Sequence, residues 1–389
     1  MPPASRSSSV DTPPTRTMAV LHPAFALTGV VHAIGGPLLP SLASTFNLGD
    51  SQSGFLFLAY YLGTSVGALL CASNHARSIT IGFFALTATS LAIAASGHTL
   101  LLPLFFTLGI SAGMPMSAIS MLAGARFTHR SAAPLTLLNF SWSAGALAAP
   151  LLAARLLTGH TYRFAYVAIA CAAGVATILC FTQLRNTAER VPVNTGKDSS
   201  ASFGFISLFA FLTFLEVGIE NTTGSWLATY ALRASVASAA GAAASSSLFW
   251  CGFLASRGLS SLVLLRMQAT RLLGIAVAAA LAASVLLIAL PGTGGRGIAM
   301  VILGAALAPI FPLLLARFFS GTRQSSDSRW VLAACGFGGS VLPWLTGVVS
   351  AQTGSLRLGL TVIPAALVLI ACALPALSAS RAHPAAPGA

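Results

Sequence analysis

Residues 203–232 read FGFISLFAFLTFLEVGIENTTGSWLATYAL, a long apolar run without Lys, Arg or Asp. About 20 mainly apolar residues are enough for an α-helix to cross the hydrocarbon core of a bilayer. Lipid offers the backbone no hydrogen bonds, so a crossing segment has to form them within itself, as a helix does. The run therefore predicts one membrane-spanning helix.

Eleven other runs share this character, and together the runs predict the fold. They fall near residues 18–42, 52–72, 78–97, 99–123, 132–156, 161–183, 236–260, 269–290, 296–319, 328–350 and 356–378. With 203–232 they predict an all-α membrane protein of twelve transmembrane helices.

The composition excludes most classes of soluble protein. Of the 389 residues, 56% are apolar and 7% are charged, whereas charged residues make up about a quarter of a soluble domain. The net charge of +13 is scattered along the chain, without the basic stripe that nucleic-acid binding needs. The six cysteines show no metal-ligand spacing, and no catalytic set of residues stands out. We therefore expect no nucleic acid, no metal, no cofactor and no enzymatic activity.

The basic residues predict how the helices are oriented. Lys and Arg collect in cytoplasmic loops. With twelve helices and a cytoplasmic N-terminus, only five of the twenty basic residues lie outside, namely Arg155, Arg163, Arg233, Arg296 and Arg357. A missed or additional helix would invert the later loops and remove this bias. We expect both termini in the cytoplasm and a multi-pass protein of the plasma (inner) membrane.

A polar segment, residues 184–202, separates two six-helix halves. GALAAP (145–150) and GGSVLP (338–343) place Gly and Pro at the same spacing in helices 5 and 11. Such interrupted pairs are typical of transporters built from repeats, which bind substrate near the midplane between the halves. The predicted organisation is a disordered cytoplasmic tail (1–17), a six-helix half (18–183), a cytoplasmic linker (184–202), a second half (203–378) and a cytoplasmic tail (379–389).

Several stretches resemble the major facilitator superfamily, in particular its fucose-permease-like sugar transporters. They include NFSWSAGALAAP (139–150), FLEVGIENTTGSWLATY (214–230) and GAALAPIFP (304–312). The resemblance covers the whole chain and implies the major facilitator fold with two rigid halves. Two features depart from the family. The loop CASNHARSIT (71–80) lacks the usual acid, and helices 1 and 4 lack the carboxylates of fucose permeases, so neither the loop lock nor that proton-coupling scheme is carried over.

Two of the seven acidic residues, Glu216 and Glu220, lie inside the apolar run of helix 7. An acid there costs about 2.5–3.5 kcal/mol on insertion scales, so it usually faces a cavity and has a function. The spacing of four residues puts both side chains on one face. Two close carboxylates in a low dielectric do not both ionise easily, which would permit proton exchange. The alternative is that one glutamate only braces a helix unwound at 221–224.

Other polar and aromatic residues extend this candidate site. The resemblance implies that Glu220, Asn221 and Trp226 contact the sugar, because hydroxyls need carboxylate or amide partners and an aromatic ring packs on a C–H face. His32, near the middle of helix 1, is either a proton carrier or hydroxyl ligand facing the glutamates, or a neutral histidine bonded to a carbonyl.

Helices 5 and 8 add three residues. Asn139 and Trp142 are three apart on one face of helix 5, either as substrate contacts or as polar contacts between helices. Arg257 is about 21 residues, roughly 30 Å, from the outer end of helix 8. We expect it at a cytoplasmic gate or at the lipid surface rather than beside Glu216.

The leading hypothesis is a secondary active transporter of a sugar or similar polyhydroxylated solute that works by alternating access, with proton symport as its coupling. Its expected partners are a small solute, protons and the lipid bilayer, and we expect a monomer. Two alternatives stay open. One is an exporter of amphipathic compounds, and the other is a membrane receptor that no longer transports.

Overall fold

The computed structural model describes residues 14–71, 74–126, 132–158, 161–184, 202–234, 238–321 and 325–379. Every regular element within these ranges is a helix. The first half contains α1 (Pro14–Phe46), α2 (Asp50–Leu69), α3 (His75–Ala95), the 3-10 turn η1 (His98–Leu100), α4 (Leu101–Arg126), α5 (Ala132–Leu157) and α6 (Tyr162–Leu184). The second half contains α7 (Phe203–Ala234), α8 (Ala239–Leu264), α9 (Ala269–Ala289), α10 (Thr293–Leu307), α11 (Ile310–Gly321), α12 (Ser325–Thr353), α13 (Leu356–Gly359) and α14 (Val362–Ala379).

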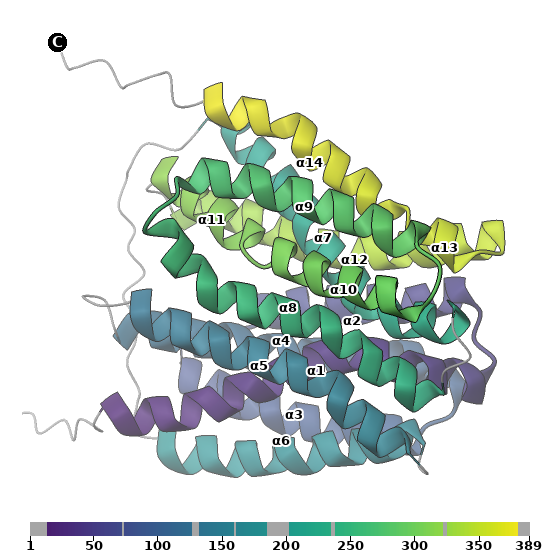
Figure 1. Ribbon diagram of the computed structural model, residues 1–389. Coiled ribbons are helices and arrows are strands. Elements are labelled where there is room, and N and C mark those ends of the chain that lie inside the picture. The colour runs from purple at the N-terminus through teal and green to yellow at the C-terminus, as the bar shows by residue number, and fades with distance from the viewer. Residues whose placement is uncertain are drawn as a thin grey trace, which may run out of the picture.

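The predicted fold of twelve transmembrane helices in two halves is confirmed. Each predicted run coincides with one helix or with a consecutive pair. In the part of the chain that the structure describes, eleven spans are long and apolar enough to cross a membrane. The span that falls short of this apolarity is α2, whose apolar residues are interrupted by Ser, Gln, Thr and Tyr. It packs between α4 and α12. Figure 1 shows α1 to α6 in the lower part of the bundle and α9 to α14 in the upper part.

Three helix boundaries differ from the expectation of uniform spans. The helix α1 begins at Pro14 and so includes the last residues of the predicted tail, while the rest of that tail, the linker segment 185–201 and residues 380–389 lie outside the described residues. The tenth span is broken between α10 and α11, at Ala308 and Pro309, and the twelfth span is divided into α13 and α14. By contrast, α7 continues as a helix through residues 221–224, so the unwinding considered above does not occur.

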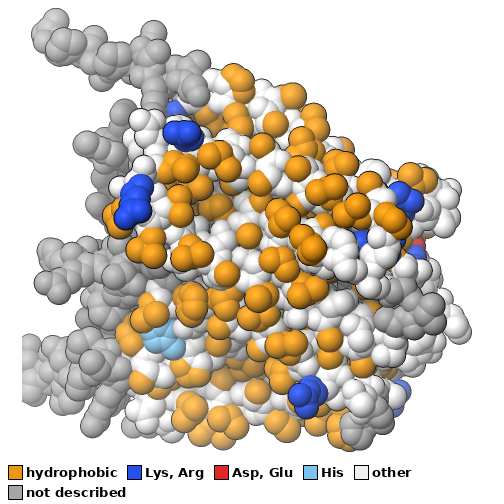
Figure 2. All heavy atoms as spheres, in the orientation of Figure 1, with side chains coloured by type: hydrophobic (Ala, Val, Ile, Leu, Met, Phe, Trp, Pro, Cys, Tyr) orange, Lys and Arg blue, Asp and Glu red, His pale blue; other side chains and the backbone are white. Residues whose placement is uncertain are grey.

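The surface of the bundle fits a lipid environment. Hydrophobic side chains cover most of the face seen in Figure 2, and the few Lys and Arg side chains visible there lie mainly toward its ends. Large apolar residues such as Phe84, Ile178 and Ile298 are more than half exposed. Lipid tails can solvate such side chains at no cost, and water cannot.

The two halves repeat the same helix packing. In the first half α1 packs on α5, α2 on α4 and α3 on α6, and in the second half α7 packs on α12, α8 on α10 and α9 on α14. The two glycines of the sequence repeat occupy equivalent contacts. A Cβ added at Gly145 would lie 1.9 Å from the carbonyl oxygen of Ala26 in α1, and one added at Gly338 would lie 1.8 Å from that of Phe214 in α7. Small residues let the backbones of membrane helices approach this closely.

We predict that Gly338→Ala lowers the thermal stability of the protein in detergent, because the new Cβ would force α12 away from α7. Overpacking of this kind costs about 1–3 kcal/mol. The matched control is Gly274→Ala in α9, where a Cβ would meet nothing within 4 Å. That change should leave stability unchanged or raise it by up to about 1 kcal/mol through helix propensity. Equal melting temperatures for the two variants would contradict the packing described here.

Candidate functional site

The two halves meet in the middle of the bundle through polar contacts centred on α7. The Nε2 atom of His32 in α1 lies 3.1 Å from the amide oxygen of Asn221 and donates to it. The hydroxyl groups of Tyr61 in α2 and Ser225 in α7 lie 3.2 Å apart. His32 therefore contacts the amide beside the glutamates, and not the glutamates themselves. Both hydrogen bonds connect the first half of the chain with the second.

A proline in α12 explains what else Asn221 does. Pro343 has no N–H group, so the carbonyl of Gly339, four residues earlier, receives no helical hydrogen bond from it. The Nδ2 atom of Asn221 lies 3.5 Å from this carbonyl oxygen and donates to it. Trp226, which is fully buried, donates from Nε1 to the carbonyl of Pro343 at 2.9 Å. In this conformation both residues satisfy the backbone of α12.

The two glutamates of α7 are buried in the same region. Glu216 has no exposed surface, and neither of its carboxylate oxygens has a hydrogen-bond partner among the described residues. Glu220 is 9% exposed. The two carboxylates interact electrostatically with each other and with the guanidinium of Arg257. A buried carboxyl group without a hydrogen bond strongly resists ionisation unless a positive charge balances it.

Arg257 lies inside the bundle, so the expectation of a lipid-facing anchor is wrong. It donates from Nη1 to the hydroxyl of Ser143 in α5 at 3.1 Å. Its Cζ atom lies 4.7 Å from the ring centre of Phe253 and 5.9 Å from that of Trp142. Counting residues along α8 gives only how deep Arg257 lies in the membrane. The direction in which its side chain points from the helix axis, toward α5 and α7, depends on how α8 packs.

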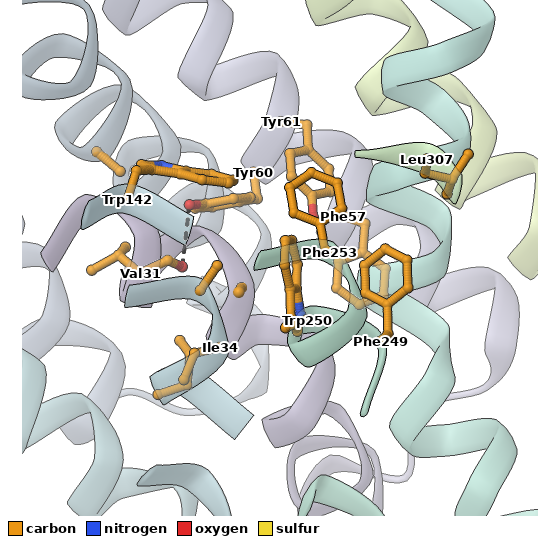
Figure 3. Packing of buried hydrophobic residues seen from close by; sticks show 14 of the residues in the cluster. Val31, Ile34, Phe57, Tyr60, Tyr61, Trp142, Phe249, Trp250, Phe253 and Leu307 are labelled. Atoms are coloured by element: carbon orange, nitrogen blue, oxygen red, sulfur yellow. Dashed lines mark hydrogen bonds between the residues drawn. The ribbon is translucent and has the colours of Figure 1, made fainter. Parts of the chain in front are cut away.

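Aromatic residues from both halves surround this polar centre. Figure 3 shows Trp142, Tyr60, Tyr61 and Phe57 facing Trp250 and Phe253 of α8 across the interface. The ring centres of Trp142 and Trp250 are 6.1 Å apart, and Trp142 lies 5.2 Å from the ring of His32. Trp142 is buried at 8% exposure.

Two cavities adjoin the interface. The smaller, beside His32 and Tyr61, holds about 10 Å³, which is enough for roughly one water. The larger holds about 390 Å³ and is lined by Asn139 and Arg257 together with parts of α9 and of the α10–α11 break. It lies toward the end of the bundle where α1, α5 and α7 begin. Asn139 is thus at this cavity, whereas Trp142, three residues later, lies deeper.

An ion pair joins the two halves at the opposite end of the bundle. Both carboxylate oxygens of Asp50, at the start of α2, accept hydrogen bonds from Arg233 near the end of α7, at 2.7 and 2.5 Å. The hydroxyl of Ser350 in α12 donates to the same carboxylate at 2.5 Å. The contact between Asp50 and Arg233 is the one ion pair among the described residues. Nothing in the sequence pattern indicated this pairing, because its members are far apart in the chain.

The described residues contain no group of three His, Cys, Asp or Glu side chains that could hold a metal ion. The sequence interpretation also missed Tyr61 and Trp250, which lie in apolar helices and read as ordinary packing residues. Their position beside His32, Ser225 and Trp142 depends on how the halves meet.

Comparison with known proteins adds a family and a set of similar folds. A model of the Major Facilitator Superfamily matches residues 21–326, and none of the curated proteins compared with the chain matches it. A D-xylose-proton symporter superimposes with a TM-score of 0.77 at 14% identity, covering 92% of this chain and 97% of that one. A bacterial homolog of the human lysosomal transporter Spinster, in an inward-facing and occupied conformation, gives 0.72 at 14% identity, covering 94% and 97%. A variant of the E. coli fucose:proton symporter FucP gives 0.60 at 16% identity, covering 93% and 98%. At these identities the likeness shows the fold alone.

We predict that Asp50→Asn opens the end of the bundle at which Arg233 lies, because Arg233 then loses the charge that holds the halves together. Spin labels at Ser44 on α1 and Gln352 on α12, in a variant without cysteines, should report a longer or broader distance distribution. The exchanged pair Asp50→Arg with Arg233→Asp should restore the original distribution. Arg357→Gln, a charge change at the same end, serves as the control. An unchanged distribution in Asp50→Asn would show that the ion pair does not hold this end closed.

Proposed function

Because the chain belongs to the Major Facilitator Superfamily, we propose that it is a secondary active transporter that carries a sugar or similar polyhydroxylated solute by alternating access, coupled to protons. The chain is a multi-pass membrane transporter and not an enzyme. The proposal has four parts: the solute is polyhydroxylated, the coupling ion is a proton, the protein lies in the plasma membrane, and it is a monomer.

The observation that carries proton coupling is the burial of Glu216. Its carboxyl group is fully buried without a hydrogen-bond partner among the described residues. An ionised carboxylate in such a place costs several kcal/mol unless it is paired. A protonated Glu216 removes this cost, and release of the proton requires access to water or a shift of Arg257. Glu216 is therefore the proton carrier in this proposal, with Glu220 as the neighbour that disfavours its ionisation.

The polar groups around Asn221 support a hydroxylated solute. Glu220, Asn221 and His32 present a carboxylate, an amide and an imidazole, which are the partners that hydroxyl groups need. Trp142 adds a flat apolar face of the kind that packs on the C–H face of a sugar. In the conformation described, His32 and Asn221 bind one another, so we propose that solute binding replaces this contact when the halves separate.

The two ends of the bundle support alternating access. One end is held by Asp50 and Arg233, and the other carries the 390 Å³ cavity. We place the cavity end in the cytoplasm, because the basic residues of the loops collect on that side.

A second candidate, export of amphipathic compounds, is favoured by one observation. The larger cavity is lined mostly by apolar residues, among them Phe140, Leu264, Phe311 and Pro312. An exporter of this kind would accept many unrelated apolar compounds and would not bind hexoses.

We predict that Glu216→Gln abolishes the accumulation of solute driven by a proton gradient and retains downhill exchange of solute. The glutamine side chain can still form hydrogen bonds with the groups around it, but it cannot release a proton. Glu220→Gln should weaken both processes. Uptake of labelled hexoses and deoxyhexoses into proteoliposomes, with and without an inward proton gradient, measures the effect.

The matched control is Thr222→Val. Thr222 lies on the same helix, and its buried hydroxyl has no partner among the described residues, so its loss should change neither process. Gradient-driven accumulation by Glu216→Gln at the wild-type rate would contradict proton coupling through this residue. Absence of uptake of every sugar by the wild type would favour the second candidate.

A further inference from the structure

Arg257 holds a positive charge inside a spanning helix that no carboxylate neutralises directly. A charged side chain inside a spanning helix usually faces a cavity or a partner, and Arg257 lies in the last third of α8. The guanidinium has five N–H donors, and its one side-chain hydrogen bond among the described residues goes to Ser143. Glu216 and Glu220 act on it electrostatically, but it forms no ion pair with any described residue. Most of its donors therefore remain available for another acceptor.

The larger cavity lies directly at this guanidinium. Its volume of about 390 Å³ falls at the lower end of the roughly 300–1,000 Å³ that is typical of small-molecule pockets. Arg257 is the one charged residue in its lining, and Asn139 and Ser260 supply the other polar side chains. The cavity can therefore hold a solute of about monosaccharide size beside a single positive charge.

The break in the tenth span forms part of the wall of the cavity. Pro309 separates α10 from α11, and Pro309, Phe311 and Pro312 line the cavity. The first N–H groups of a helix have no partner within the helix, and its N-terminus carries a partial positive charge. Broken helices whose N-termini point toward an anionic group of the substrate occur in other transporters. The break thus places two helix ends, the C-terminus of α10 and the N-terminus of α11, at the wall of the cavity.

The remaining lining limits which anion fits. One guanidinium balances one negative charge, so a phosphate dianion would be left partly unneutralised in an apolar wall. A carboxylate matches the planar fork of arginine with two parallel hydrogen bonds. The rings of Phe140 and Phe311 suit the C–H face of the solute, and Asn139 and Ser260 suit a small number of hydroxyl groups.

We propose that the cavity beside Arg257 binds the carboxylate of an organic monocarboxylate, and that the transported solute is a sugar acid rather than a neutral sugar. In the conformation described, in which the His32–Asn221 contact is intact, the carboxylate pairs with Arg257 and the hydroxylated body lies against Asn139 and Phe311. This inference rests on the proposed function for the polyhydroxylated body of the solute. The carboxylate site itself stands on Arg257 and the cavity.

The test measures binding to the purified full-length protein and uptake into proteoliposomes for four probes: a hexuronate, the corresponding neutral hexose, a hexose phosphate and benzoate. We expect the hexuronate to bind most tightly. Arg257→Gln should raise its Kd and KM by roughly 10- to 100-fold, the loss expected for a charged hydrogen bond. Arg257→Lys, which keeps the charge without the fork, should give an intermediate loss. Arg271→Gln, an exposed charge at the same end, is the control and should bind the hexuronate as the wild type does.

The outcomes separate this inference from the proposed function. Tighter binding of the neutral hexose or of the hexose phosphate than of the hexuronate would overturn the inference, and so would an Arg257→Gln variant that is well folded and binds the hexuronate unchanged. Benzoate binding that depends on Arg257, without binding of any sugar acid, would support the carboxylate site and overturn the polyhydroxylated solute. Uptake of the hexuronate that does not respond to a proton gradient would support the site and overturn the proton coupling.

Discussion

The structure depends on one constraint, that every polar backbone group inside the membrane must find its partner within the protein. Pro343 is an example of this constraint, because it has no N–H group and leaves the carbonyl of Gly339 without a hydrogen-bond donor in the helix. Asn221 donates to that carbonyl and accepts from His32, so one amide joins α12 to α7 and α1. The carbonyl that Pro343 leaves free in α12 is therefore linked through Asn221 to His32 in the other half, and rotation of the halves has to exchange these hydrogen bonds.

The fold could be predicted because each helix is specified locally. A span needs only sufficient length and apolarity, so the apolar runs located the helices without knowledge of their neighbours, and α2 was located the same way although it is less apolar than the other spans. The repeat was also visible in the sequence, since Gly145 and Gly338 both occupy positions where backbones touch. Glu216 and Glu220 could also be singled out from the sequence alone, because placing a glutamate in a membrane helix costs free energy whichever way its side chain points. These signals need no information about tertiary contacts.

The rest of the site could not be predicted, because it depends on rotation and on contacts between distant residues. Residue counting placed Arg257 at a certain depth in α8, but only the packing of α8 on α5 brings it to Ser143 and Trp142. Asp50 and Arg233 are 183 residues apart and meet because α2 begins and α7 ends at the same end of the bundle. The sequence predicted Asn221 and Trp226 as solute contacts. In the structure both side chains donate hydrogen bonds to backbone carbonyls of α12.

In the proposed function, the charges in the centre couple solute and proton without the carboxylates that fucose permeases place in helices 1 and 4. Glu216, Glu220 and Arg257 share a low-dielectric region, where a net charge costs several kcal/mol. With one guanidinium present, only one carboxylate can be ionised without leaving a net charge, so the other has to hold a proton. Any group that changes the charge near Arg257 then changes the number of protons that the glutamates hold. Coupling of this kind needs only three residues and a change of access, and it is independent of the loops in which this chain departs from its family.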